Sequence, residues 1–140
     1  MSINLNNNKK LIGYVTVRKF GGYALPVPIQ NKLLKSYCEE NKYTYVLPLC
    51  ELYIIDSYMA LNSTLKKCSH NAEIGMCSIF MFPRNKSKFE QIYKVIFEKK
   101  IVLHFIFENK IVTHSNLMEY YVFSRIHEIM PDKGFLLESL

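Results

Sequence analysis

Short apolar stretches alternate with stretches of helical periodicity along this chain of 140 residues. The apolar stretches are rich in β-branched and aromatic residues and are bounded by Gly, Pro, Asn or charged residues, which is typical of buried strands. The predicted strands are residues 11–17, 43–49, 74–82 and 101–107. The third stretch is apolar without alternation, so we expect it at the centre of a parallel sheet that is covered on both faces.

Between these stretches, apolar residues recur at positions i, i+3, i+4 and i+7, which predicts amphipathic helices. Three of the helices cover residues 28–41, 57–68 and 115–130. A fourth begins at a capping box formed by Ser87 and Glu90 and ends near Lys99 and Lys100. The residues expected to start the helices are Pro28, Asp56, Ser87 with Glu90, and Ser115. The side chains of the last helix expected to face the core are Leu117, Met118, Tyr121, Val122, Ile126 and Ile129.

This order of elements predicts the α/β class. We expect a three-layer, doubly wound fold with a mainly parallel sheet of four to five strands, the fifth supplied by an extended piece at residues 110–113. Pro48 would remove a hydrogen-bond donor from the second strand and so places that end at a sheet edge. Residues 1–10 are expected to be a flexible polar lead-in, and residues 11–140 a single α/β domain with one core.

Charge and cysteine usage narrow the class of partner. The chain has 18 Lys and Arg against 12 Asp and Glu, a net charge of +6, which suits an anionic ligand. The basic residues are dispersed, so a solvated surface is favoured over a nucleic-acid patch.

Four cysteines without a CxxC pair indicate free thiols and no zinc site. With no signal-peptide pattern and no apolar run of membrane-spanning length, we expect a cytoplasmic protein without a membrane partner.

The residues that follow the predicted strands are the candidates for a site, because helix N-termini and loops converge at the carboxyl ends of parallel strands. Arginine and lysine there would bind a phosphate or carboxylate, and a carboxylate could move a proton or hold a hydroxyl. The candidates for anion or sugar binding are Arg18, Lys19, Arg84 and Asn109. The candidates for catalysis are Glu51, His104 and Glu108.

Each of these candidates has a structural alternative. Arg18 could form an ion pair with Glu51 or Glu108, and His104 lies among apolar neighbours, where a hydrogen-bonded core histidine is the more common case. Gly21 and Gly22 match neither the dinucleotide fingerprint nor the Walker spacing, and no other motif assigns a cofactor.

Scattered short matches make the chain resemble the sporadic carbohydrate cluster protein family. They lie at residues 13–18, 28–31, 37–38, 80–83 and 103–109, within a span of roughly residues 11–125. Members of that family are found among genes for lipopolysaccharide, capsule and other surface carbohydrates. The resemblance implies a cytoplasmic role in making or modifying an unusual sugar.

A more distant resemblance, in element order and in the opening Gly-Tyr strand, is to the catalytic domain of serine recombinases, or resolvases, which implies a resolvase- or flavodoxin-like fold. That family opens Tyr-x-Arg-Val-Ser with serine as the nucleophile, whereas this chain has Tyr14-Val15-Thr16-Val17-Arg18. Without the serine no phosphoserine intermediate can form, so we expect a related fold without DNA strand exchange. The same resemblance implies a homodimer through residues 115–130.

Together these observations favour an enzyme that acts on a phosphorylated or nucleotide-linked sugar. Arg18, with Lys19 or Arg84, would hold the anion, and Glu108 or Glu51 would contact hydroxyls or move a proton. Two alternatives stay open: a non-catalytic adaptor or regulatory subunit of a carbohydrate-pathway enzyme, and a degenerate recombinase-like protein that binds DNA.

Overall fold

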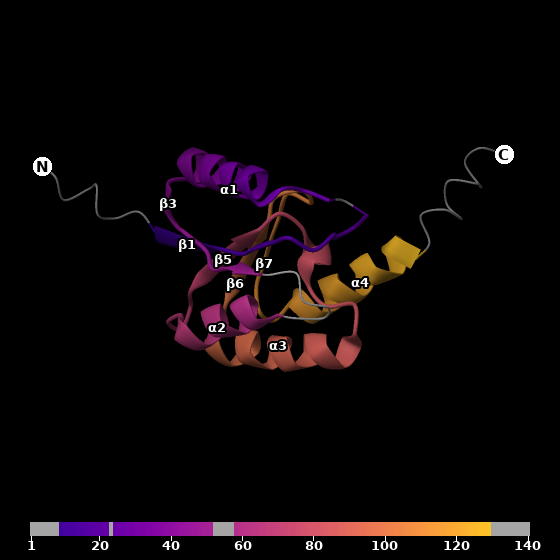
Figure 1. Ribbon diagram of the computed structural model, residues 1–140. Helices are drawn as coiled ribbons and strands as arrows, with labels where there is room; N and C mark the ends of the chain where they lie inside the picture. Colours follow the sequence, from indigo (N-terminus) through magenta and orange to yellow (C-terminus); the bar gives the residue numbers. More distant parts are fainter. Residues whose placement is uncertain (1–8, 23, 52–57, 130–140) are drawn as a thin grey trace, which may run out of the picture.

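The computed structural model describes residues 9–22, 24–51 and 58–129, and it has the predicted α/β architecture (Figure 1). The helices are α1 (Val27–Asn41), α2 (Met59–Lys67), α3 (Lys86–Lys99) and α4 (Leu117–Ile129), with a 3₁₀ turn η2 (Ile79–Met81). The strands are β1 (Lys9–Gly13), β2 (Val15–Thr16), β3 (Tyr43–Val46), β4 (Cys50–Glu51), β5 (Glu73–Met76), β6 (Val102–Phe105) and β7 (Lys110–Val112).

Five of the strands form one sheet in the order β3-β1-β5-β6-β7. The first four are parallel to their neighbours, and β7 is antiparallel to β6. Counted along the chain this is the order 2-1-3-4-5, which doubly wound folds of the flavodoxin-like kind have. The predicted mainly parallel sheet is therefore confirmed. Because the winding reverses between β1 and β5, a crevice is expected outside the carboxyl ends of these two strands.

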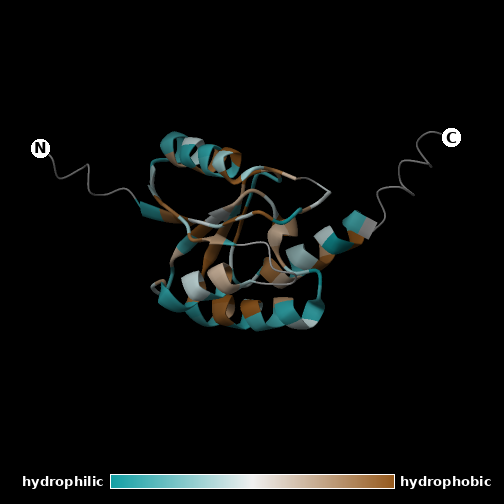
Figure 2. Ribbon diagram, in the orientation of Figure 1, coloured by the Kyte–Doolittle hydropathy of each residue, from teal (hydrophilic) through white to brown (hydrophobic). Residues whose placement is uncertain are grey.

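Helices cover both faces of the sheet. In Figure 1, α1 lies above it, α2 and α3 lie below it, and α4 extends beyond the carboxyl ends of the strands. Figure 2 shows hydrophobic residues on the central strands and hydrophilic residues on the outer side of α3. The layers pack closely, since a Cβ atom on Gly75 of β5 would lie 2.8 Å from Leu11 and 3.2 Å from Leu34 of α1. In the part of the chain that the structure describes, no helix is both long and apolar enough to span a membrane.

The first predicted strand, residues 11–17, is two strands in the structure. β1 begins two residues earlier, at Lys9, inside the predicted lead-in, and ends at Gly13. Tyr14 still donates its N–H to the carbonyl of Gly75 (2.9 Å), after which β2 leaves the main sheet and pairs with β4. At this point the Tyr14 hydroxyl donates a hydrogen bond to the carboxylate of Glu51 in β4.

The third predicted strand, residues 74–82, is only partly extended. β5 ends at Met76, and η2 occupies residues 79–81. Ser78 starts the turn, since its hydroxyl oxygen accepts from the N–H of Phe80 (3.1 Å). The predicted strand was therefore wrong for residues 77–82. An apolar run indicates that residues are buried but does not distinguish a strand from a turn, and Ile79 and Met81 of this turn are each 1% exposed.

Helix positions are confirmed better than helix ends. The predicted capping box at Ser87 is wrong, because α3 begins at Lys86 and its N-cap is Asn85, whose side-chain oxygen accepts from the N–H of Lys88 (3.1 Å). The predicted cap Asp56 lies outside the described residues. β3 is an edge strand, as Pro48 indicates.

The last helix buries less than its pattern predicts. Leu117 and Tyr121 are buried as expected. Val122 and Ile126 are 40% and 48% exposed, so their predicted inward orientation is wrong. The helix begins at Leu117, and the Ser115 hydroxyl forms a hydrogen bond with that of Thr113 (3.1 Å). The buried stripe is narrow: Tyr121 stacks on Phe89 of α3 and donates to the carbonyl of Pro83, whereas Val122 and Ile126 face away from these contacts.

Candidate anion-binding site

Two adjoining pockets lie where the carboxyl ends of the central strands meet α3 and α4. The first, which we call the cationic pocket, has a volume of about 410 Å³. Its charged lining residues are Arg18, Lys19, Arg84 and Lys88. Among the described residues that line it, none has a carboxylate side chain. The aromatic rings of Tyr58 and Phe80 complete much of its wall.

The second, which we call the carboxylate pocket, has a volume of about 900 Å³. It shares part of its wall with the cationic pocket, namely Gly21, Gly22, Phe80 and Arg84. The remaining residues that line it are Leu25, Ser78, Phe107, Glu108, His127 and Glu128. The two pockets therefore meet at the Gly21–Gly22 turn, Phe80 and Arg84, and among the described residues carboxylates line the second pocket but not the first.

Arg18 is held in place by groups from three segments. Its N–H donates to the Thr16 hydroxyl (3.1 Å), and its guanidinium donates to the Tyr14 hydroxyl (3.0 Å) and to the carbonyl of Met81 (3.3 Å). The guanidinium carbon also lies 4.0 Å from the centre of the Tyr58 ring. These contacts fix the orientation of the cation, so little conformational freedom is left to lose when an anion binds.

Glu51 lies behind Arg18 and lines neither pocket. Its carboxylate is 2% exposed and accepts from the Tyr14 hydroxyl (3.0 Å) and from the N–H groups of Ala60 (3.0 Å) and Leu61 (3.2 Å) in the first turn of α2. Burial raises the pKa of Tyr14, and the nearby Arg18 cation opposes that rise. The phenol therefore stays protonated, so it can donate to Glu51 while it accepts from Arg18. Glu51 was predicted to contact ligand hydroxyls or to move a proton. The structure places it outside both pockets, with the contacts of a residue that positions Tyr14.

Glu108 lines the carboxylate pocket. One carboxylate oxygen accepts from the Ser78 hydroxyl and the other from the N–H of Ile79, both at 2.8 Å. Burial raises the pKa of Glu108, and the two hydrogen bonds oppose the rise. No basic side chain among the described residues forms an ion pair with this carboxylate. It is therefore a partly buried charge that two neutral donors stabilise.

Arg84 connects the pockets, and Asn109 lies outside both. The Arg84 side chain is 76% exposed and pairs with Glu128 (3.0 Å). Asn109 is exposed in the turn that leads to β7, with φ of 52°, and its N–H donates to the carbonyl of Ile106. The structure thus brings Arg18, Lys19 and Arg84 together and leaves Asn109 apart from them.

His104 lies away from both pockets. It is 0% exposed in the middle of β6. One ring nitrogen contacts the Tyr37 hydroxyl (2.6 Å) and the other contacts a Glu73 carboxylate oxygen (2.7 Å), which also accepts from Tyr43 (2.8 Å). This is the arrangement of a hydrogen-bonded core histidine, the structural alternative that the sequence left open.

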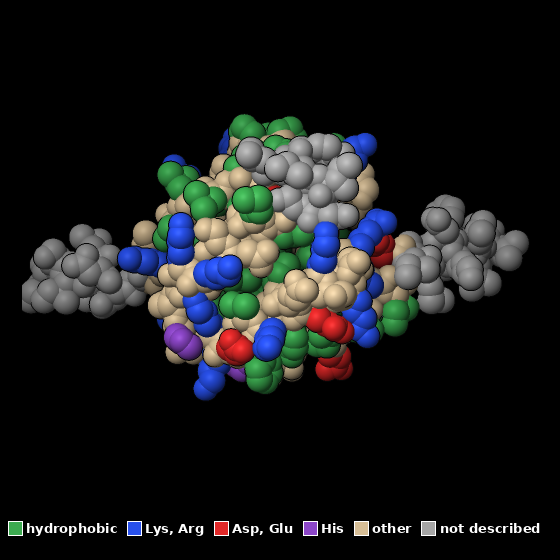
Figure 3. Space-filling model, turned by 60° about the horizontal axis from the view of Figure 1, so that its bottom comes forward, with side chains coloured by type: hydrophobic (Ala, Val, Ile, Leu, Met, Phe, Trp, Pro, Cys, Tyr) green, Lys and Arg blue, Asp and Glu red, His purple; other side chains and the backbone are tan. Residues whose placement is uncertain are grey.

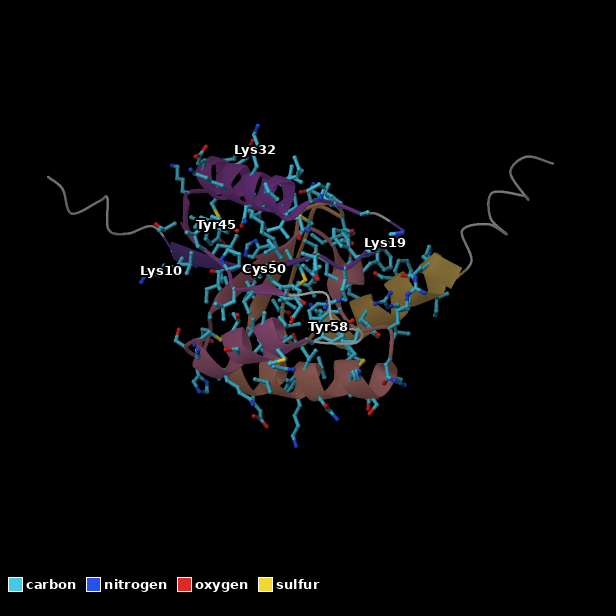
Figure 4. The ribbon with its side chains drawn as sticks, in the orientation of Figure 1. Lys10, Lys19, Lys32, Tyr45, Cys50 and Tyr58 are labelled. Carbon is cyan, nitrogen blue, oxygen red and sulfur yellow. The ribbon has the colours of Figure 1, made fainter. Side chains whose placement is uncertain are left out.

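Three residues of the site were missed at the level of sequence: Tyr14, Tyr58 and Lys88. Lys88 lies in the first turn of the helix that follows the third predicted strand, and that position could have identified it, because such turns border the crevice. In the sequence Tyr14 looks like an ordinary core residue, because it is buried and only its hydroxyl contacts polar groups. Figure 4 shows Lys19 on the side of the molecule opposite Lys10, which lies near the start of β1, and Tyr58 nearer the middle.

On the face seen in Figure 3, Lys and Arg side chains are dispersed among other residues. The buried thiols of Cys38 and Cys77 are free, and burial raises their pKa to about 11 and about 12, which keeps them protonated near neutral pH. The described part of the chain contains no group of three or more His, Cys, Asp or Glu that could hold a metal ion.

Comparison with known proteins adds no relative: no protein-family model matches the chain, and no curated protein matches it.

Proposed function

We propose that the protein binds a phosphorylated or nucleotide-linked sugar in the cationic pocket and acts as a cytoplasmic enzyme of surface-carbohydrate biosynthesis. The observation that carries the proposal is the charge of the pocket: four basic side chains surround a volume of about 410 Å³ with no carboxylate among its described lining residues. A phosphate group offers the charge and the oxygen acceptors that such a set of donors recognises.

The uncharged part of the wall suits the rest of such a ligand. Tyr58 and Phe80 present aromatic surface beside the cations. Aromatic walls combined with a few convergent polar groups are typical of small-molecule sites and can pack against a sugar ring or a base. The assignment to carbohydrate biosynthesis draws on the resemblance to the sporadic carbohydrate cluster family.

In this proposal Glu108 is the group that moves a proton. Glu108 lines the carboxylate pocket, which adjoins the cationic pocket. Its pKa is raised by burial, which brings it toward the range in which a carboxyl can act as a general acid or base. Arg18 binds the anion, and Glu51 acts through Tyr14 by fixing Arg18.

Isothermal titration calorimetry tests the proposal. The panel consists of glucose 6-phosphate, UDP-glucose and inorganic phosphate, with unphosphorylated glucose as the negative control. We expect the phosphorylated compounds to bind and Lys88→Ala to weaken them by about tenfold or more, since a charge-assisted hydrogen bond contributes about 1.5–3 kcal/mol. Lys94→Ala, on an exposed part of α3 outside both pockets, is the matched control and should leave affinity unchanged. Absence of binding by every phosphorylated compound would contradict the proposal.

A further inference from the structure

The carboxylate pocket contains Glu108 and Glu128, whereas no carboxylate lies among the described residues that line the cationic pocket, and the two pockets share one wall. We propose that it binds an amino group, so that the ligand of the joined site is a phosphorylated amino sugar with its phosphate beside Arg18 and its ammonium group beside Glu108. This inference rests on the proposed function and narrows its substrate class.

The wall that the two pockets share includes the Gly21–Gly22 turn. Gly21 has φ of 56°, and a Cβ atom there would lie 3.2 Å from the Phe80 ring. Gly22 has φ of 81° and contributes no side chain to the shared wall. Because left-handed φ values favour glycine, the turn brings backbone alone to the junction. A ligand can therefore reach from one pocket into the other across this turn.

Glu108 is the carboxylate that is available to a ligand cation. Glu128, the other carboxylate in this pocket, already pairs with Arg84 (3.0 Å) and Arg125 (2.6 Å). Glu108 instead accepts from two neutral donors, Ser78 and the backbone of Ile79, and has no ion pair among the described residues. A partly buried carboxylate without a countercharge is costly, so an ammonium group placed there gains more than a hydroxyl group would.

The walls around Glu108 also favour a cation. Phe80 and Phe107 line the same pocket. The face of an aromatic ring attracts an ammonium group, and this attraction is strongest where water is displaced. The Phe80 ring already lies 5.5 Å from the guanidinium carbon of Arg125, so its electrostatics suit a positive neighbour.

Two matched pairs of ligands test the inference by calorimetry near neutral pH: glucosamine 6-phosphate against glucose 6-phosphate, and UDP-glucosamine against UDP-glucose. Within at least one pair, we expect the amine to bind about tenfold more tightly, as a charge-assisted hydrogen bond predicts. Glu108→Gln should remove this preference, so that the amine and its hydroxyl counterpart bind with similar affinity. Glu128→Gln is the control and should keep the preference.

The outcomes separate the two proposals. If all four compounds bind but neither pair shows a preference for the amine, the inference is wrong and phosphate binding in the cationic pocket stands. If none of the four binds, both proposals fail together. The preference of the unaltered protein decides the matter even if Glu108→Gln does not fold.

Discussion

The hydroxyl of Tyr14 connects the side chains of Arg18 and Glu51. It accepts from the guanidinium and donates to the carboxylate, each at 3.0 Å. An arginine at the mouth of a pocket usually keeps much of its rotamer freedom, and here a buried phenol removes it. Arg18 is the residue proposed to bind the anion, whereas the residues that determine its orientation lie behind it.

Replacing Tyr14 with Phe should reduce both stability and binding. The substitution removes a donor from a buried carboxylate and an acceptor from Arg18, so we expect the free energy of unfolding to fall by about 1–3 kcal/mol. Affinity for glucose 6-phosphate should fall as well. Urea unfolding and calorimetry measure the two effects. Tyr93→Phe is the control, since the Tyr93 hydroxyl has no hydrogen bond among the described residues; equal effects of both substitutions would contradict the role of Tyr14.

Glu108 should make stability depend on pH in an unusual direction. Its pKa is raised in the folded state, so the folded protein binds the proton more tightly than the unfolded chain does. Its contribution to stability is then fully present below the ordinary pKa of a glutamate and is lost as pH rises through the raised folded value. Glu108→Gln removes this contribution. Urea unfolding at a series of pH values should therefore show a less steep loss of stability with rising pH in the variant, and an unchanged slope would contradict the raised pKa.

Two helices end in a residue with left-handed backbone that is not glycine. Lys42 follows α1 with φ of 62°, and Lys100 follows α3 with φ of 55°. Both close the helix with backbone hydrogen bonds, the Lys42 N–H to the carbonyl of Cys38 and the Lys100 N–H to those of Ile96 and Phe97. A Cβ atom makes this conformation costly, so the lysines are retained at some expense of stability.

Glycine at either of these positions should stabilise the protein. We expect Lys42→Gly and Lys100→Gly each to raise the free energy of unfolding by about 0.5–1 kcal/mol, because the relief of strain exceeds the entropy that glycine loses on folding. Thermal or urea unfolding measures the change. Lys35→Gly, at an exposed position inside α1, should instead destabilise by about 1 kcal/mol. If Lys42→Gly instead destabilises the protein as much as Lys35→Gly does, the result contradicts a strained left-handed conformation at Lys42.

α4 presents an exposed apolar strip made of Val122, Phe123 and Ile126. The homodimer through residues 115–130 stays a prediction, and this strip is the surface that it would bury. Phe123 is 57% exposed, so Phe123→Lys should leave the fold intact and convert a dimer to a monomer. Light scattering after gel filtration measures the mass; a monomeric unaltered protein would show that the prediction is wrong.

At the scale of the whole molecule, the sequence predicted the layers and the parallel sheet because helices and strands bury side chains with different periods. It could not predict where the first and third strands break. At those breaks, Tyr14 and Ser78 form hydrogen bonds with Glu51 and Glu108, which lie 37 and 30 residues further along the chain. Contacts of that separation leave no local pattern.

The sequence also allowed the location of the site to be predicted, but not the arrangement of residues within it. The carboxyl ends of parallel strands meet at one edge, so Arg18, Lys19 and Arg84 could be expected near one another. The separation of cations and carboxylates into two pockets depends on the Gly21–Gly22 turn and on the placement of Phe80. Neither follows from the periodicity of the chain.

The bonds that Glu51 forms with the first turn of α2 make that helix a reporter of the binding site. The N–H groups of Ala60 and Leu61 end on the same carboxylate that holds Tyr14 and, through it, Arg18. A phosphate ligand that immobilises Arg18 should therefore slow amide hydrogen exchange at Ala60 and Leu61, although neither residue lines a pocket. Exchange measured by NMR with and without glucose 6-phosphate would show this coupling as protection of α2 at a distance from the ligand.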